Sequence, residues 1–290
     1  MLGSTTGNTL KDVSLAIDRR IKGTGFDYSK YRKRNIESCN LCGSHADSWD
    51  LYSYRDRYGL PIRSMRCNSC GLIFITPRME ELVYDEFYKN WYRKLVAAFS
   101  NQPEEEQAKS RSIGIGSDIA IKFLAQNMPD GLDIKKMLDV GGSTGIFADK
   151  VCKTCGCKGT VVDPNVSELK EALDKGLSTC CSQFTGFVTG DRYDLISMLR
   201  TVEHLSDITK ALQKVSQLLT EQGIFLIDIV NHKWLMKMFK DRNICTKIDH
   251  IYQLTDETIC QYFKIWFPNH EVVKGDTSNR YILYLVKPKC

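Results

Sequence analysis

Two pairs of cysteines near the N-terminus share a short pattern. Cys39 and Cys42 stand in the sequence CNLCG, and Cys67 and Cys70 stand in CNSCG. Four thiolates at this spacing can close a tetrahedral zinc site, and the glycine after each pair permits the tight turn in which backbone N–H groups face sulfur. Since four cysteines leave no open coordination position, we expect a structural zinc ion. Chance pairing or a redox role is the alternative.

A second chemical feature is the sequence MLDVGGSTGIF, residues 137–147. Its apolar start predicts a buried parallel strand, and its small residues predict the turn into a helix that begins at Ile146. Such a strand end lets the backbone approach a cofactor, and the helix N-terminus favours negative ligand groups. A dinucleotide fingerprint would need glycine where Ser143 and Ile146 stand, and the phosphate-loop pattern is missing too. An ordinary strand-to-helix turn is the alternative.

This stretch resembles the first motif of class I S-adenosylmethionine-dependent methyltransferases, LDVGxGxGxF. The matching residues are Leu138, Asp139, Val140, Gly141, Gly145 and Phe147. Ser143 replaces the middle glycine of the motif. The resemblance implies S-adenosylmethionine as cofactor and an α/β fold, a Rossmann-like seven-stranded class I methyltransferase domain.

The elements that must position this motif follow in order. Predicted strands cover Gly159–Asp163, Leu177–Cys181, Tyr193–Leu199 and Ile224–Val230, with an antiparallel pair at Glu271–Lys274 and Tyr281–Val286. Helices are expected at Ile208–Leu219, before a stop at Gly223, and at Asp256–Trp266. Asp163 ends its strand where an acid can accept both ribose hydroxyls of an adenosine, and a turn aspartate before Pro164 is the alternative.

The methyltransferase pattern implies a set of cofactor-binding residues at these strand ends. They are Asp139, Gly141, Gly142, Ser143, Gly145, Phe147, Asp163, Pro164, Ser182, Leu199 and Arg200. Ser182 is included because adenine usually rests just after the third strand, which also nominates Gln183 and Phe184.

Three histidines stand where the pattern places the acceptor. His204 lies in a stretch similar to the family phrase YDLIxxxxVLEHL, His232 follows the fifth strand, and His250 lies in DHIYQLT, which resembles EHxxxFT. Histidine is the natural base near neutral pH, so we expect one of them to be catalytic. A capping or packing role is the alternative for each. Tyr252 is a further candidate.

The segment CGLIFITPR, residues 70–78, extends the resemblance to bacterial methyltransferases associated with sugar modification in surface polysaccharides and antibiotics. That family begins with a two-knuckle zinc ribbon followed by a tyrosine-rich helix, here predicted over Met79–Phe99. Its aromatic face comprises Tyr84, Phe87, Tyr88, Trp91 and Tyr92. An aromatic stripe at helical spacing favours a core role, and a wall of the acceptor pocket is the alternative.

Four parts are predicted. They are an N-terminal extension (1–36) with a short helix near Val13–Ile21, the zinc ribbon (37–78), a helical connector or lid (79–130), and the S-adenosylmethionine-binding domain (131–290). The connector holds a linker or helix start at residues 101–109 and a helix at Ile119–Asn127. We expect Cys152, Cys155 and Cys157 to be reduced structural thiols, with a second metal site as the alternative.

Charge and hydropathy narrow the class of protein. Residues 1–100 hold 16 Lys and Arg against 11 Asp and Glu, whereas the other 190 hold 24 against 24. The basic N-terminal third favours a phosphate-bearing or otherwise anionic substrate, with a solvated basic arm as the alternative, and the neutral remainder argues against a large nucleic-acid surface. No apolar run approaches the roughly 20 residues that span a bilayer, and the start lacks the apolar core of a secretion signal. We therefore expect a cytoplasmic protein without a membrane span.

The expected function is methyl transfer from S-adenosylmethionine to a small sugar-like acceptor, either nucleotide-linked or part of a surface glycan. Sugar C-methyltransferases carry an additional C-terminal domain, so the shorter tail favours O- or N-methylation. One alternative is an RNA methyltransferase that binds nucleic acid through the ribbon, and this alternative predicts salt-sensitive binding of RNA. Another is a scaffold with a degenerate cofactor pocket marked by Ser143.

Overall fold

A seven-stranded sheet forms the centre of the computed structural model, which describes residues 10–104 and 115–289. The strand order is β12-β13-β10-β9-β6-β7-β8, and β13 runs antiparallel to both of its neighbours. The bounds are β6 Lys136–Val140, β7 Lys158–Asp163, β8 Ser178–Cys181, β9 Tyr193–Met198, β10 Leu219–Val230, β12 His270–Lys274 and β13 Tyr281–Pro288. The predicted α/β class and strand sequence are confirmed.

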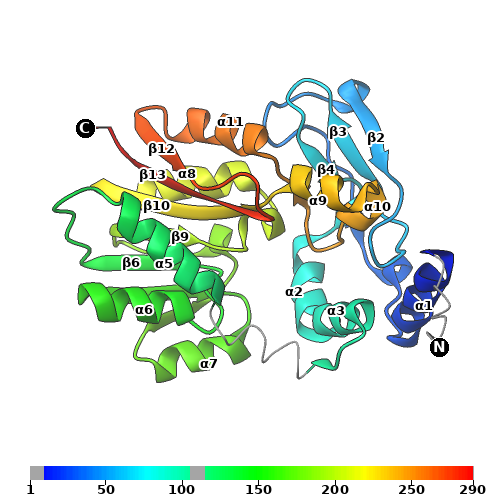
Figure 1. Ribbon diagram of the computed structural model, residues 1–290, viewed down its shortest axis with the longest axis horizontal. Helices are drawn as coiled ribbons and strands as arrows, with labels where there is room; N and C mark the ends of the chain where they lie inside the picture. The colour runs from blue at the N-terminus through cyan, green and yellow to red at the C-terminus, as the bar shows by residue number, and fades with distance from the viewer. Residues whose placement is uncertain (1–9, 105–114, 290) are drawn as a thin grey trace, which may run out of the picture.

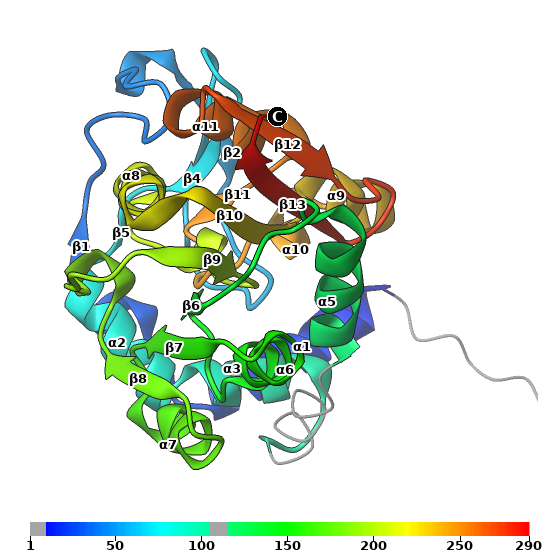
Figure 2. The same cartoon turned by 90° about the vertical axis from the view of Figure 1, so that its left-hand side faces the viewer.

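Helices cover both faces of this sheet (Figure 2). One face carries α5 (Ile115–Asn127), α6 (Ile146–Cys155) and α7 (Val166–Asp174), and the other carries α8 (Ile208–Leu218) and α11 (Asp256–Trp266). Successive strand residues point to opposite cores, since Met137 packs with α5–α7 whereas Leu138 packs with α8 and α11. Burial on both faces explains why the parallel strands are almost continuously apolar.

A smaller antiparallel sheet contains the N-terminal strands β2 (Trp49–Ser53), β3 (Ser64–Cys67) and β4 (Ile73–Ile75). Its fourth strand, β11 (Tyr252–Gln253), comes from the C-terminal part of the chain and pairs with β4. Figure 1 shows this sheet beside α9 (His232–Phe239) and α10 (Arg242–Cys245), at the right of the large sheet. The ribbon segment is therefore completed by residues that follow β10.

The tyrosine-rich segment differs from its prediction. It forms a short strand and two helices, β5 (Arg78–Met79), α2 (Glu81–Asn90) and α3 (Tyr92–Ser100), in place of one helix over 79–99. The chain turns at Trp91, whose ring packs against Phe26. β5 pairs with β1 (Lys33–Arg34), which adds a backbone constraint that helical periodicity does not reveal.

The start of β10 is a second correction. The strand begins at Leu219, so Gly223 lies inside it at a register shift and does not end a helix. A Cβ at Gly223 would lie 2.9 Å from the Tyr193 carbonyl oxygen, so glycine permits the close approach of the two backbones.

The remaining described elements are short or N-terminal. They are α1 (Leu10–Gly23) and the 3-10 turns η1 (Tyr28–Lys30), η2 (Ala46–Ser48), η3 (Phe184–Gly186) and η4 (Val202–His204). The helix predicted near Val13–Ile21 lies within α1. The predicted linker 101–109 is described only as far as Glu104, and the rest of it lies outside the described residues. None of the described helices is long and apolar enough to cross a membrane.

Candidate functional site

The loop between β6 and α6 is built on left-handed backbone conformations. Gly141, Ser143 and Gly145 have φ angles of 69°, 52° and 73°. A Cβ at Gly141 would overlap the Thr201 side chain, and one at Gly145 would lie 2.6 Å from Leu177 Cδ1. Glycine is therefore required at both ends of the loop, whereas the middle position accepts serine in a conformation that disfavours most side chains.

Asp139, the last but one residue of β6, has one unpaired oxygen in the described structure. Its Oδ1 accepts a hydrogen bond from Ser197 Oγ (2.8 Å), and its Oδ2 is buried without a partner in the described structure. Burial raises the pKa of this carboxyl to about 7. An orphaned buried carboxylate oxygen fits a donor group such as the amino group of a cofactor, which would restore its hydrogen bonding.

Asp163 closes the loop from the end of β7. Its Oδ2 accepts from the Ser143 N–H (3.1 Å), and its Oδ1 accepts from the Asn165 N–H (2.8 Å). Burial raises the pKa of Asp163 to about 6. The structure thus brings both predicted acids, Asp139 and Asp163, to neighbouring strand ends around the same glycine loop.

Ser143 has a second role that the sequence did not suggest. Its Oγ donates to one oxygen of Glu168 on α7, and the other Glu168 oxygen pairs with Arg93 on α3. This chain of contacts ties the connector helix to the loop. A serine at the middle motif position is therefore integrated into the fold here, which gives the departure from the family glycine a physical reason.

The other predicted cofactor residues have varied surroundings. Phe147 lies in the first turn of α6 and is buried in the core, and Arg200 adopts a left-handed conformation in which its backbone N–H and its Nε both donate to Asp228. Leu199 is half-buried, and its carbonyl accepts from Thr201 Oγ1. Pro164 and Ser182 follow β7 and β8 directly. Gly142 lies against Asp139, since its Cβ would come 2.5 Å from Oδ2.

His204 and His250 come together from separate parts of the chain. Their rings lie 4.8 Å apart at right angles. His204 Nδ1 lies 2.7 Å from the Asp249 carbonyl oxygen, which can only accept, so Nδ1 carries a proton. Tyr88 from α2 also contacts this nitrogen, at 2.8 Å. In neutral His204 this contact leaves the lone pair at Nε2, the nitrogen that would act as a general base.

His250 has the opposite tautomer. Lys247 Nζ lies 3.1 Å from His250 Nε2, and an ammonium can only donate, so Nε2 accepts and Nδ1 carries the proton. Burial and the Lys247 charge lower the pKa of His250 well below its usual value. Lys247 also forms a buried ion pair with Asp249 (2.7 Å). His250 thus presents an N–H donor at Nδ1, while its Nε2 lone pair is already engaged.

His232 and Tyr252 have other partners. His232 starts α9, and its Nε2 lies 2.7 Å from the Tyr52 hydroxyl of β2. Burial lowers the pKa of His232 to about 4, so it is neutral near pH 7. The Tyr252 hydroxyl accepts from Arg78 and donates to the Ser206 carbonyl. Both side chains join the ribbon to the large domain.

Sequence reasoning missed several residues of the histidine cluster. Glu203 is fully buried, and burial together with the Asp228 charge raises its pKa to about 8. In the sequence Tyr88 belongs only to an aromatic stripe, and Lys247 has no local motif. Glu203, His204 and His250 place ligand atoms within 4.8 Å of one another, but the ammonium on His250 Nε2 competes with any cation there.

The four knuckle cysteines converge as the spacing predicts. The sulfur pairs Cys39–Cys70 and Cys42–Cys67 are each 3.5 Å apart, and all four sulfurs lie within 4.8 Å of one another. Sulfurs about 2.3 Å from zinc would lie about 3.8 Å apart in a tetrahedron. The glycines that follow, Gly43 and Gly71, have φ angles of 74° and 81°. The donor set and its spacing fit a structural zinc ion.

The third group of cysteines forms no comparable cluster. Cys157 Sγ lies 3.2 Å from Cys152 Sγ, whereas Cys155 is exposed at the end of α6. Across residues 10–104 and 115–289, these three do not form a group with metal-ligand geometry. A surface hollow of about 760 Å³ lies between α1 and α3, and the described residues that line it belong to neither candidate site.

The strand order and the loop geometry define a class I methyltransferase fold, and comparison with known proteins agrees. The chain belongs to the family described as "Methyltransferase domain", whose model matches residues 84–265. A curated relative is the ubiquinone biosynthesis O-methyltransferase of Bradyrhizobium sp. (strain ORS 278), 24% identical over 105 residues, which are 34% of this chain and 41% of that protein. The chain thus spans about two fifths of the length of that relative.

A solved structure shows the same fold, and a second one is also similar to the chain. The plantazolicin methyltransferase BpumL, solved with a pentazolic desmethylPZN analog and SAH, is 13% identical with a TM-score of 0.52, over 71% of this chain and 95% of that one. An S-adenosylmethionine-dependent methyltransferase from Clostridium acetobutylicum ATCC 824 is 20% identical with a TM-score of 0.47, over 60% and 91%. At 13% identity the likeness to BpumL concerns the fold alone.

Proposed function

We propose that this protein transfers a methyl group from S-adenosylmethionine to a hydroxyl or amino group of a small sugar-like acceptor. The observation that carries the proposal is a glycine loop flanked by two buried acids in a chain of the methyltransferase family. The similarity to an O-methyltransferase favours oxygen as the acceptor atom. The sugar-like acceptor rests on the resemblance of the ribbon and the segment after it.

The cofactor supplies an activated methyl group on sulfur, so the chain must orient the acceptor and remove a proton. Asp139 would hold the amino group of the cofactor, and Asp163 would hold its ribose hydroxyls. The backbone of the glycine loop would lie against the cofactor. The His204 Nε2 lone pair would take the acceptor proton as the acceptor atom bonds to the methyl carbon, whose bond to sulfur breaks so that S-adenosylhomocysteine leaves. The His250 Nδ1–H would donate a hydrogen bond to the acceptor.

Transfer of labelled methyl tests this proposal. Purified protein is incubated with labelled S-adenosylmethionine and, separately, with a nucleotide-sugar and glycan extract or total RNA. Asp163→Ala removes the proposed ribose contact, and Asp174→Ala on the exposed end of α7 is the matched control. We expect label in the sugar pool with the native protein and the control, and none with Asp163→Ala. Label confined to RNA would overturn the acceptor, and failure to bind S-adenosylhomocysteine would indicate a degenerate scaffold.

A further inference from the structure

Asn40 links the first cysteine knuckle to the catalytic domain. Its Nδ2 donates to Asp207 Oδ1 (2.8 Å), and its Oδ1 accepts from the Thr209 N–H (3.2 Å) and the Tyr262 hydroxyl (2.8 Å). Its carbonyl accepts from Thr209 Oγ1 (2.6 Å). One residue between two proposed metal ligands therefore makes four hydrogen bonds to α8 and α11.

These contacts fix the segment that carries His204. Asp207 is the N-cap of α8, three residues beyond His204, and it also accepts from the Lys210 N–H. Arg78, at the end of the ribbon segment, donates to the Ser206 carbonyl (2.6 Å). The ribbon thus holds Ser206, Asp207 and Thr209 in succession, directly after the turn η4.

The ribbon also holds the partner of His204. Asp56, in the loop between β2 and β3, accepts a hydrogen bond from the Ile248 N–H (3.0 Å). Ile248 directly precedes Asp249, whose carbonyl accepts from His204 Nδ1. The Arg57 N–H donates to the Thr246 carbonyl (3.0 Å). Both sides of the His204–Asp249 hydrogen bond are therefore anchored to the ribbon segment, residues 37–78.

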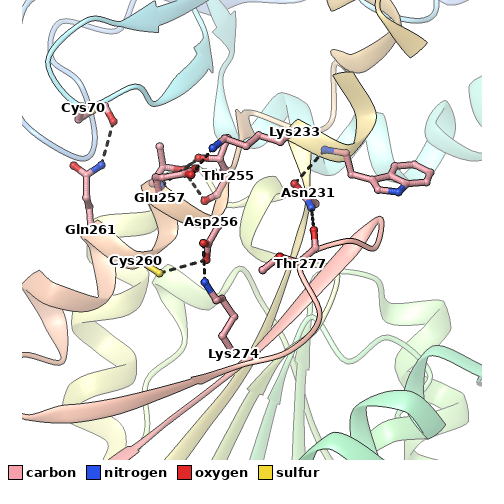
Figure 3. Close-up of polar contacts among 12 residues, drawn as sticks. Cys70, Asn231, Lys233, Thr255, Asp256, Glu257, Cys260, Gln261, Lys274 and Thr277 are labelled. Atoms are coloured by element: carbon pink, nitrogen blue, oxygen red, sulfur yellow. Dashed lines mark hydrogen bonds and ion pairs between the residues drawn. The ribbon is translucent and has the colours of Figure 1, made fainter. Parts of the chain in front are cut away.

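Backbone hydrogen bonds close the first cysteine knuckle. The Cys39 N–H donates to the Ser44 carbonyl and the Gly43 N–H to the Cys39 carbonyl, each at 2.8 Å. Gln261 on α11 donates to the Cys70 carbonyl of the second knuckle (3.2 Å; Figure 3). A bound metal would hold these turns, and with them the Asn40 side chain, in one arrangement.

We propose that Asn40 is a positioning residue, through which the metal-bound knuckle sets the tautomer and orientation of His204. The catalytic consequence rests on the proposed function, whereas the coupling of the knuckle to the imidazole does not. Asn68 occupies the same position in the second knuckle, and its side chain is exposed. Asn68→Ala is therefore the matched control for Asn40→Ala.

The test measures the imidazole directly. In protein labelled with ¹⁵N-histidine, long-range ¹H–¹⁵N correlation spectra report which ring nitrogen carries the proton, and His204→Gln assigns the signal. We expect the Nδ1–H form of His204 in the native protein and in Asn68→Ala, and a mixture of tautomers in Asn40→Ala. Zinc content is measured on each sample and should remain one per chain.

A second variant keeps the test decisive if Asn40→Ala loses zinc. Tyr262→Phe removes one hydrogen bond to Asn40 from outside the ribbon and should shift the His204 signal in the same direction by a smaller amount. An unchanged His204 tautomer in the variants that retain zinc would overturn the proposal. Affinity for S-adenosylhomocysteine should stay within about twofold, while the transfer rate of Asn40→Ala falls about tenfold. Native protein that binds no S-adenosylhomocysteine would refute the proposed function and leave the tautomer result valid.

Discussion

Two buried acids at the ends of β6 and β7 have pKa values raised into the physiological range. Burial raises the pKa of Asp139 to about 7 and that of Asp163 to about 6. Each carboxyl is protonated below its pKa, and only the ionised form accepts hydrogen bonds at both oxygens. Cofactor binding should therefore depend on pH through these two residues.

The affinity for S-adenosylhomocysteine should fall about tenfold from pH 8 to pH 6, because protonation of Asp139 removes the acceptor for the cofactor amino group. Isothermal titration calorimetry at pH 8, 7 and 6 measures this change. Asp139→Asn should bind weakly and lose the step near pH 7, whereas Asp174→Asn should behave as the native protein. A pH-independent affinity of the native protein would contradict the assignment.

The two histidines should differ in their effect on catalysis. His204→Gln removes the lone pair at Nε2 and should lower kcat by about 10²–10⁴-fold. His250→Gln should cost about tenfold or less, since the Nε2 of His250 already accepts from Lys247. Single-turnover transfer assays at saturating cofactor measure both variants, with cofactor affinity as the control for folding. The reverse order of effects would assign the base to His250.

At the scale of elements, α6 is flanked by two left-handed glycines with different surroundings. Gly145 at its start faces Leu177 and Ala172, whereas nothing lies within 4 Å of a Cβ at Gly156. Gly145 therefore provides the left-handed backbone conformation and also leaves room for Leu177 and Ala172, whereas Gly156 provides only the left-handed conformation. Local sequence does not distinguish the two.

Gly156→Ala should cost about 1 kcal/mol of unfolding free energy, the usual penalty of a left-handed alanine, and leave cofactor affinity unchanged. Gly145→Ala should cost more, because its Cβ meets Leu177 at 2.6 Å, and should weaken cofactor binding by displacing the loop. Urea denaturation and calorimetry measure both quantities. Equal effects of the two substitutions would show that packing against Leu177 is easily relieved.

At the scale of the whole molecule, the ribbon and the large sheet share their chain segments. β11 enters the small sheet, and α11, which follows it, contacts both the knuckle through Gln261 and β12 through the ion pair of Asp256 with Lys274 (Figure 3). A metal that orders the ribbon should therefore stabilise the catalytic domain as well.

Removing a metal ligand should accordingly lower the stability of the whole chain. Cys39→Ser should abolish stoichiometric zinc and lower Tm by about 5–10 °C, since a loss of about 3 kcal/mol is expected for a chain of this size. Cys155→Ser, at an exposed thiol, should retain zinc and the native Tm. Metal analysis and differential scanning calorimetry give the two values. Native stability without zinc would show that the ribbon folds on its own hydrophobic contacts.

The sequence by itself determined the elements whose pattern is local. The strands, the loop of small residues, Asp139 and Asp163 at strand ends, and the paired knuckles follow from periodicity and spacing, because each depends on neighbours in the chain. The single helix predicted over 79–99 was wrong, since β5 and the turn at Trp91 depend on the distant residues of β1 and on Phe26.

Only the tertiary structure decided how the histidines differ. The sequence nominated His204, His232 and His250 alike, and their tautomers and pKa values depend on partners that lie elsewhere in the chain or have no motif, such as Tyr52, Tyr88 and Lys247. Hydrogen bonds across the fold fix which nitrogen keeps its lone pair, and burial fixes which ring stays neutral. These are properties of the environment of a residue, so composition and spacing do not contain them.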